Sequence, residues 1–523
     1  MINLFLINFY NLFFHFLHNF VITFLPEIFL AIGILSLIGY KILFKQRFSH
    51  VYSIAFVFIS FILLLTTIFL VCWVYFNSYF WNSGFFFLGS YKISFMKTVI
   101  LSISTICLVL FRHSLTKSQT NCLEYLICYL FINLICLIIL MINTSQFYTL
   151  LVFFEFLTLC FYILSSFNYE NYGFLIFRLI PTRKLLYFSL LLVCIGIFLL
   201  KSYHHINIFA LSDSISESFY LRFIILNREY LLIIGIISIL VSLVFKMVVF
   251  HSPTEFIYYR KTPVVTVIYM HLVPKVMFFY FISEFVYTNY YFLIVNYWVK
   301  LVLLCMSLIC LIISIGMRRL FLKHFMEYLS LVNSGYLLLC FVPLTYGSLY
   351  SSFYFIFFYI FIIFSYGGVL LFIDDSISPG RRISFDLIFL NIEKQDYYTI
   401  IISAFFFFFL GLPPTRRDYP CSRGVPFNGV VLQWLLIESL LSGECYVIVF
   451  FLLIFNIIIF FFYVGTIIPF WYEKRKLSLL RFPKYLNLFL VEFISLFGII
   501  IILIFVQFDN NLILNFLKTF YYN

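Results

Sequence analysis

The chain of 523 residues is too apolar to be a water-soluble protein. Hydrophobic residues make up 64% of it, charged residues 10%, and the mean hydropathy is +1.10, whereas an ordinary soluble domain is roughly a quarter charged. Apolar runs long enough to cross a bilayer as helices, about 20 residues each, recur between short polar connections. Because lipid leaves unpaired backbone groups without partners, this pattern predicts an all-α polytopic membrane protein.

Two kinds of site are excluded by residue content. The 12 Cys include no C-x-x-C pair, so neither a metal site nor a disulfide framework is indicated. Of the nine His, only His251 and His271 lie near helix interiors, which is too few for the paired ligands of a cytochrome b haem. The 76 Phe and 40 Tyr spread through nearly every apolar run, which indicates codon bias in an A/T-rich genome rather than an aromatic binding box.

In chain order, an apolar segment at residues 1–21 without Lys or Arg is followed by about 14 predicted transmembrane helices. We expect the first segment to be interfacial, residues 22–142 to hold helices 1–4, and residues 147–288 to form a first repeat of helices 5–8. A second repeat of helices 9–12 occupies residues 300–442, and helices 13–14 lie in residues 447–523. Interruptions in helices 7 and 12, at corresponding places, indicate two related halves of a transporter fold. The predicted spans are 22–40, 51–76, 93–111, 124–142, 147–167, 186–200, 230–252, 263–288, 300–316, 325–345, 351–373, 396–442, 447–471 and 486–508.

The basic residues give an independent test of this span count. Of the 33 Lys and Arg, 21 fall in connections after odd-numbered spans, and 6 fall after even-numbered spans or at the chain ends. Basic residues collect on one side of a membrane, so this bias predicts an even number of spans with both termini on the opposite, outer side. The net charge of +12 then reflects topology, and nucleic acid is not an expected partner.

Ionisable side chains lie inside several predicted spans. Glu155 and Lys246 are each mid-span, where an unpaired charge costs about 2.5 kcal/mol or more, and Lys275 lies deep in the next helix. A static ion pair that pins helices together is one interpretation. The alternative is a pump element, in which moving Glu155 changes the proton affinity of Lys246. Lys97 lies close to the end of its span, so we expect it to extend its charged group to the interface.

His271 and Lys275 are four residues apart and share one face of their helix. The imidazole could pass a proton along a water chain, or it could be a hydrogen-bonded packing residue. Pro274 opens the backbone beside Lys275, and irregular backbone at membrane depth is tolerated where it is buried in protein or lines a water-filled cavity. The polar residues are therefore expected to share a hydrated axis.

Several motifs resemble the antiporter-like subunits of respiratory complex I, and most closely its subunit 2 family. The opening Leu25-Pro26-Glu27 with IFLAIGILSL resembles the first span, and Glu155 in FFEFLTLCFYILSSF resembles the membrane glutamate of that family. The most specific block follows the family order: Phe245-Lys246, Phe250-His251, Thr262-Pro263-Val264 and Val273-Pro274-Lys275. The segment from Arg319 to Tyr336, and then Gly411 to Pro414 with QWLLIESL from Gln433, resemble later parts of the family.

The resemblance covers residues 25 to about 470 and implies an antiporter-like fold with two inverted repeats and broken helices 7 and 12. It also implies proton translocation as a subunit of a NADH:ubiquinone reductase in the mitochondrial inner membrane, with both termini on the intermembrane-space side. Glu155 and Lys246 would form the coupling pair and Lys275 the central relay. This chain would carry no cofactor and no metal: NADH, FMN, iron-sulfur clusters and ubiquinone would bind elsewhere in the complex. Its partners would be other membrane-arm subunits, including its paralogues, and lipids such as cardiolipin.

Two features depart from the family. The family usually has a lysine toward the proton exit where this chain has Gln433, and an amide cannot take up a proton. The insertion between Pro414 and Gln433 is longer than the family turn and adds three Arg. Two alternatives therefore stay open: a stand-alone cation/proton antiporter of the same fold, and a structural complex I subunit whose proton path has decayed.

Overall fold

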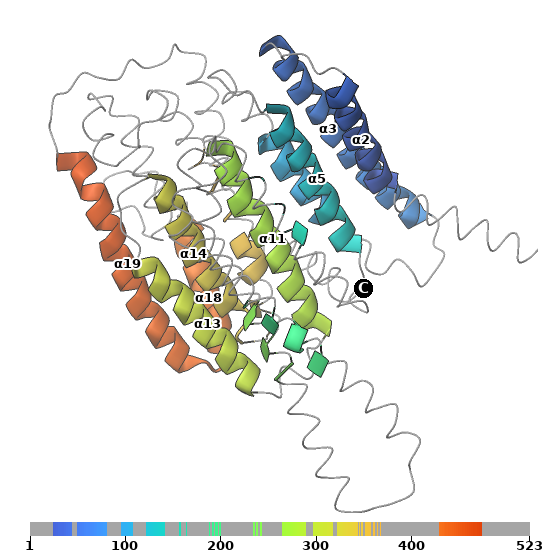
Figure 1. Cartoon of the computed structure of the whole chain (residues 1–523). Helices are drawn as coiled ribbons and strands as arrows, with labels where there is room; N and C mark the ends of the chain where they lie inside the picture. The colour runs from blue at the N-terminus through green and yellow to red at the C-terminus, as the bar shows by residue number, and fades with distance from the viewer. Residues whose placement is uncertain are drawn as a thin grey trace, which may run out of the picture. The chain divides into compact units, whose positions relative to one another are not determined.

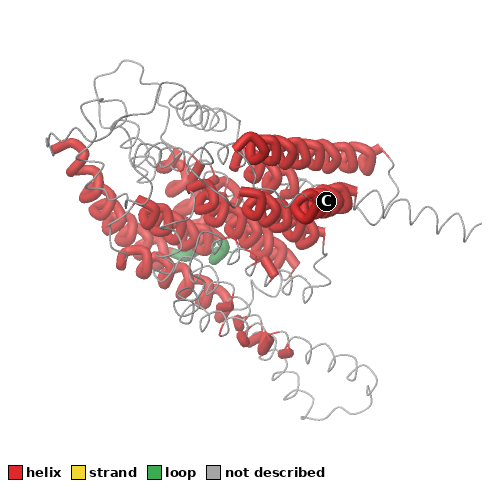
Figure 2. The backbone as a smooth tube through the Cα atoms, turned by 45° about the horizontal axis from the view of Figure 1, so that its top comes forward, coloured by secondary structure: helices red, strands yellow, loops and turns green. Residues whose placement is uncertain are grey.

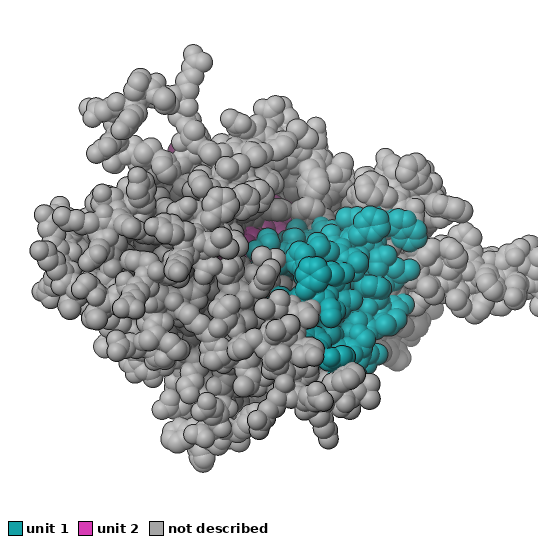
Figure 3. Space-filling view, turned by 90° about the horizontal axis from the view of Figure 1, so that it is seen from above, with its two compact units in different colours: residues 1–168, 516–523 teal, residues 169–515 magenta. Residues whose placement is uncertain are grey.

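The computed structural model describes the helices and turns at 25–43, 50–80, 96–107, 122–141, 264–288, 297–316, 322–343 and 428–472, with single helical positions between 156 and 242 and further positions between 345 and 367. Every described helix is an α-helix, and no strand occurs among these residues (Figures 1 and 2). The chain divides into two compact units: residues 1–168 with 516–523, and residues 169–515 (Figure 3). The predictions for residues 1–21 and for the span at 486–508 lie outside the described residues.

The first unit is built on α2 (Leu25–Leu43), α3 (His50–Phe80), a helix at 96–107 and α5 (Cys122–Met141). Helix α2 packs against both α3 and α5. It approaches α3 closely at Gly33, where an added Cβ would lie 2.8 Å from the Leu63 side chain. The outward side chains of α2, among them Ile32 and Leu35, are as apolar as its buried ones. A helix that is apolar all round suits lipid better than water.

The second unit surrounds α11 (Val264–Thr288), in which every side chain from Val265 to Tyr280 is buried. Helix α14 (Leu322–Cys340) packs against α11, α13 (Tyr297–Gly316) and α18 (Asn428–Ser442). Helices α13 and α14 lie close together at Gly335, where a Cβ would lie 2.9 Å from Leu311 Cγ and 3.2 Å from the Ser307 carbonyl oxygen. Helix α11 therefore lies in the interior of the described part of this unit.

Helical positions from 351 to 367 run antiparallel to α11. Gly367 lies against Ile268, Tyr359 hydrogen-bonds the His271 carbonyl, and the rings of Phe353 and Phe279 meet edge to face at 4.9 Å. Residue numbers rise along α11 while they fall along these positions, which is the signature of antiparallel packing. A Cβ at Gly367 would come within 2.3 Å of Ile268, so glycine allows this close approach.

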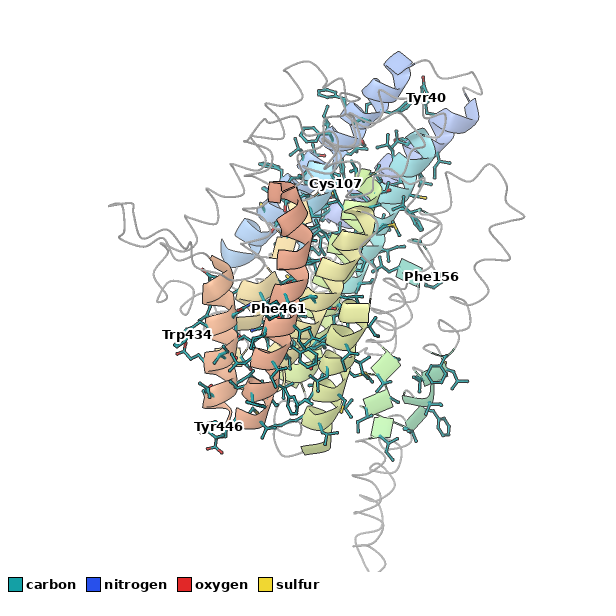
Figure 4. All side chains as sticks on the ribbon, turned by 90° about the vertical axis from the view of Figure 1, so that its left-hand side faces the viewer. Tyr40, Cys107, Phe156, Trp434, Tyr446 and Phe461 are labelled. Carbon is teal, nitrogen blue, oxygen red and sulfur yellow. The ribbon has the colours of Figure 1, made fainter. Side chains whose placement is uncertain are left out.

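A tight turn joins α18 to α19 (Tyr446–Tyr472). The Cys445 amide donates to the Leu440 carbonyl and the Glu444 amide to the Leu441 carbonyl, the pair of bonds that defines a Schellman motif. Glu444 occupies the left-handed position at φ 59°. The adjoining Gly443 lies against Pro343. The resulting hairpin turns apolar side chains such as Trp434, Tyr446 and Phe461 outward (Figure 4).

Within the described residues, one stretch, Phe56–Trp73, is long and apolar enough to cross a membrane by length and composition. Seven shorter apolar helical stretches accompany it. The helices α2, α3, α5, α11, α13, α14 and α19 each overlap a predicted span.

Candidate functional site

Lys275 lies in the interior of the second unit. Its side chain is 4% exposed and projects from the middle of α11, one residue after Pro274. The ammonium donates a hydrogen bond to the backbone carbonyl of Ser330 on α14. It also lies over the ring of Tyr359, with 4.4 Å between Nζ and the ring centroid. Neither contact supplies a negative charge, although a buried ammonium is costly unless it is paired.

His271 is brought to the same place, as its spacing from Lys275 predicts. It is fully buried on α11, one turn before the lysine. The Tyr359 hydroxyl donates to the His271 carbonyl at 3.3 Å. Tyr359 therefore contacts α11 twice, through its ring at Lys275 and through its hydroxyl one turn earlier.

Small polar groups accompany this lysine on α14 and α13. Ser330 and Ser334 of α14 are buried, and Cys310 of α13 lies close enough to Lys275 to interact with it electrostatically. Two turns of α14 beyond Ser330, the Tyr336 hydroxyl hydrogen-bonds the Asn456 amide oxygen of α19. The helices around Lys275 thus carry polar groups close to the buried ammonium.

Gln433 lies on α18 and is half-exposed. The same helix reaches the 351–367 positions through a hydrogen bond between the Ser439 and Ser351 hydroxyls, at 3.5 Å. The remaining predicted site residues, Glu155, Lys246 and His251, lie outside the described residues, as does most of the insertion at 415–432. Their roles stay predictions.

A second buried charge was assigned wrongly from sequence. Lys97 was expected to reach the interface, but its side chain is only 4% exposed and its ammonium bonds Glu27 Oε1 in the first unit. Distance from the end of a span could not reveal a partner 70 residues away in the chain. Glu27 carried a signal, because it is a carboxylate in the first turn of an apolar helix.

Sequence comparison gives no relative, since no family model and no curated protein matches the chain. Solved structures do share its fold. A chain of respiratory complex I from Thermus thermophilus superposes with a TM-score of 0.59 at 15% identity, over 91% of this chain and 95% of that one. A chain of the membrane-bound sulfane sulfur reductase, an archaeal respiratory membrane complex, gives 0.69 at 12% identity, over 96% and 98%. A chain of the Mrp complex from Dietzia sp. DQ12-45-1b gives 0.55 at 13% identity, over 88% and 80%.

These likenesses show that the chain shares its fold with chains of multi-subunit membrane complexes. A fold shared with chains of membrane complexes agrees with the apolar composition of this chain.

Proposed function

We propose that the chain is a proton-translocating membrane-arm subunit of NADH:ubiquinone oxidoreductase, respiratory complex I, and most like its subunit 2. The observation that carries this proposal is Lys275, a lysine buried at the centre of an antiporter-like fold with a carbonyl and an aromatic ring as its contacts. Ionisable residues at membrane depth are costly and mark ion and proton pathways. The motif order from Phe245 to Lys275 and the fold shared with a chain of complex I support the same assignment.

Each proposed site residue has a role in this account. Glu155 and Lys246 form the coupling pair at the entrance, and Lys275 is the central relay. His271 and His251 flank the water chain that connects them. The chain performs no redox chemistry; NADH, FMN, iron-sulfur clusters and ubiquinone belong to other subunits of the complex, and quinone reduction there drives the proton movement.

The contacts of Lys275 suit a relay. A carbonyl and a ring face stabilise the ammonium by modest amounts, about 1.5–3 kcal/mol for a hydrogen bond to a charged group and roughly 2 kcal/mol for a desolvated cation–π contact. A carboxylate would hold the charge far more firmly. Lys275 can therefore release its proton when charge arrives nearby, which a permanent ion pair would oppose.

Gln433 restricts how protons can leave the proposed path. An amide cannot accept a proton at physiological pH, so the path past it has to use water and hydroxyl groups. The hydrogen-bonded pair of Ser351 and Ser439 lies on the helices that border this region and can pass protons between waters. We assign the insertion at 415–432 no role in proton transfer.

The proposed setting is the mitochondrial inner membrane, with both termini facing the intermembrane space. The partners are the other membrane-arm subunits of the complex, including paralogous antiporter-like subunits. Lipids such as cardiolipin would cover apolar side chains that α19 turns outward, among them Phe450 and Ile457.

Purification of the tagged chain in mild detergent tests this proposal. We expect it to co-purify with NADH:ubiquinone reductase activity and with the redox subunits of complex I. The fold shared with a chain of the Mrp complex favours one competitor, a stand-alone cation/proton antiporter. A chain recovered without redox partners that exchanges sodium for protons would establish that competitor and reject the complex I assignment.

A further inference from the structure

The first unit contains a charged pair of its own. Lys97 of the 96–107 helix donates a hydrogen bond to Glu27 Oε1 of α2, and the two residues are 4% and 5% exposed. They are the only charged residues among the described side chains of this unit. Among the described side chains of this unit, each of the two charges therefore has only the other as a charged neighbour.

The second carboxylate oxygen is the unusual feature of this pair. Glu27 Oε2 is buried and has no hydrogen-bond partner among the described residues. Leaving a buried hydrogen-bond acceptor without a donor lowers the stability of the fold by about 1–3 kcal/mol, and by more for a charged group. Such an atom therefore calls for an explanation. If the ion pair only held two helices together, it would be more stable with both carboxylate oxygens hydrogen-bonded.

The chemistry of the site limits what Oε2 can bind. A metal cation would be repelled by the adjacent Lys97 ammonium and would find only one carboxylate oxygen. A proton needs a single lone pair, because it forms a covalent O–H bond. The other titratable groups described on the neighbouring helices are all neutral in their ordinary state and supply no competing charge: Tyr40, Cys72, Cys107, Cys128, Tyr129, Cys136 and Cys160.

We propose that Glu27 is a proton-binding site of the first unit, with Lys97 as its fixed counter-charge. A hydronium ion transfers its proton to Oε2, an O–H bond forms, and a water molecule leaves. Lys97 remains an ammonium and continues to donate to Oε1. The charge of the pair changes from zero to plus one, and the reverse transfer restores it. This proposal concerns a different unit from Lys275 and stands whether or not the complex I assignment holds.

Infrared difference spectroscopy of the full-length chain in lipid, purified with whatever subunits accompany it and recorded between neutral and acidic pH, tests the site. We expect a carboxylic acid C=O band that shifts in D₂O and disappears in Glu27→Gln. The matched control is Glu438→Gln, which removes an exposed carboxylate on α18 and should leave this band unchanged.

Glu27→Gln holds the pair permanently at plus one, the charge of the protonated state, and can lower the yield of folded protein, so two further variants keep the test decisive. Glu27→Gln/Lys97→Met removes both charges and should assemble without the band. Lys97→Arg keeps both charges and should shift the band, since Arg changes the hydrogen bonding at Oε1. The proposal is overturned if the wild-type complex shows no such band, if the band survives in either Glu27 variant, or if Lys97→Arg leaves it in place.

Discussion

At the scale of single residues, Tyr359 contacts both the buried lysine and the helical turn before it. Its ring faces the Lys275 ammonium and its hydroxyl bonds the His271 carbonyl. The two contacts can be separated, because phenylalanine keeps the ring and loses only the hydroxyl.

We predict that Tyr359→Phe costs about 0.5–1.5 kcal/mol through the lost hydrogen bond and retains most proton transport. Tyr359→Leu should reduce transport further, because it also loses a cation–π contact of roughly 2 kcal/mol. Transport by the purified complex in proteoliposomes, with the thermal midpoint of unfolding, measures both effects. Equal losses of proton transport and of thermal stability in the two variants would show that the hydroxyl group contributes to both and that the ring does not.

Lys275 and His271 could be predicted from the sequence, but the groups that contact them from other helices could not. Lys275 was conspicuous because a charge in an apolar run is rare, and His271 followed from the four-residue spacing. Tyr359 was one of 40 tyrosines, and nothing in its local sequence distinguished it. Asn456 offered a clearer signal, since it is the one amide in the apolar helix α19, where Tyr336 bonds it.

At the scale of elements, the turn between α18 and α19 stores backbone strain. Glu444 adopts a left-handed conformation, which costs a residue with a Cβ about 1–2 kcal/mol. Gly443 beside it is needed for a different reason, because a Cβ there would lie 2.6 Å from the Pro343 Cβ.

Substitutions at these adjacent positions should therefore have opposite effects. We expect Glu444→Gly to stabilise the hairpin by about 1 kcal/mol, since glycine adopts the left-handed conformation freely. Gly443→Ala should destabilise it, because the new methyl group would overlap Pro343. Thermal midpoints of unfolding, measured for both variant complexes under the same conditions, test whether the two effects are opposite. A lower midpoint for Glu444→Gly would contradict the assigned strain.

Element positions were predictable where element partners were not. Seven described helices overlap predicted spans because the length of an apolar run is a local property. The Glu27–Lys97 pair and the antiparallel packing along α11 join segments 70 or more residues apart. Such contacts depend on how helices pack, which a single sequence without visible repeats does not encode locally.

At the scale of the whole molecule, the distribution of basic residues sets a testable orientation. In the proposed mitochondrial setting, the Lys and Arg that follow odd-numbered predicted spans would place those connections in the matrix and both chain ends in the intermembrane space. The connection at 473–485 is the most basic of them.

We predict that a protease added to mitochondria without their outer membrane removes epitope tags from both termini. A tag inserted in residues 473–485 should survive until the inner membrane is opened. This inserted tag is the control for membrane integrity. Protection of either terminus under the first condition would mean an odd number of spans or the opposite orientation.

The central claim is that Lys275 carries protons for the complex, and proton transport per NADH oxidised is the most direct measure of it. We predict that Lys275→Met lowers coupled proton transport by about tenfold or more, since a positioned proton carrier commonly contributes ~10²–10⁴ in rate. Lys300→Met, at a half-exposed lysine on α13 of the same unit, should leave it unchanged. Assembled Lys275→Met complex that pumps protons at the wild-type ratio would contradict the account.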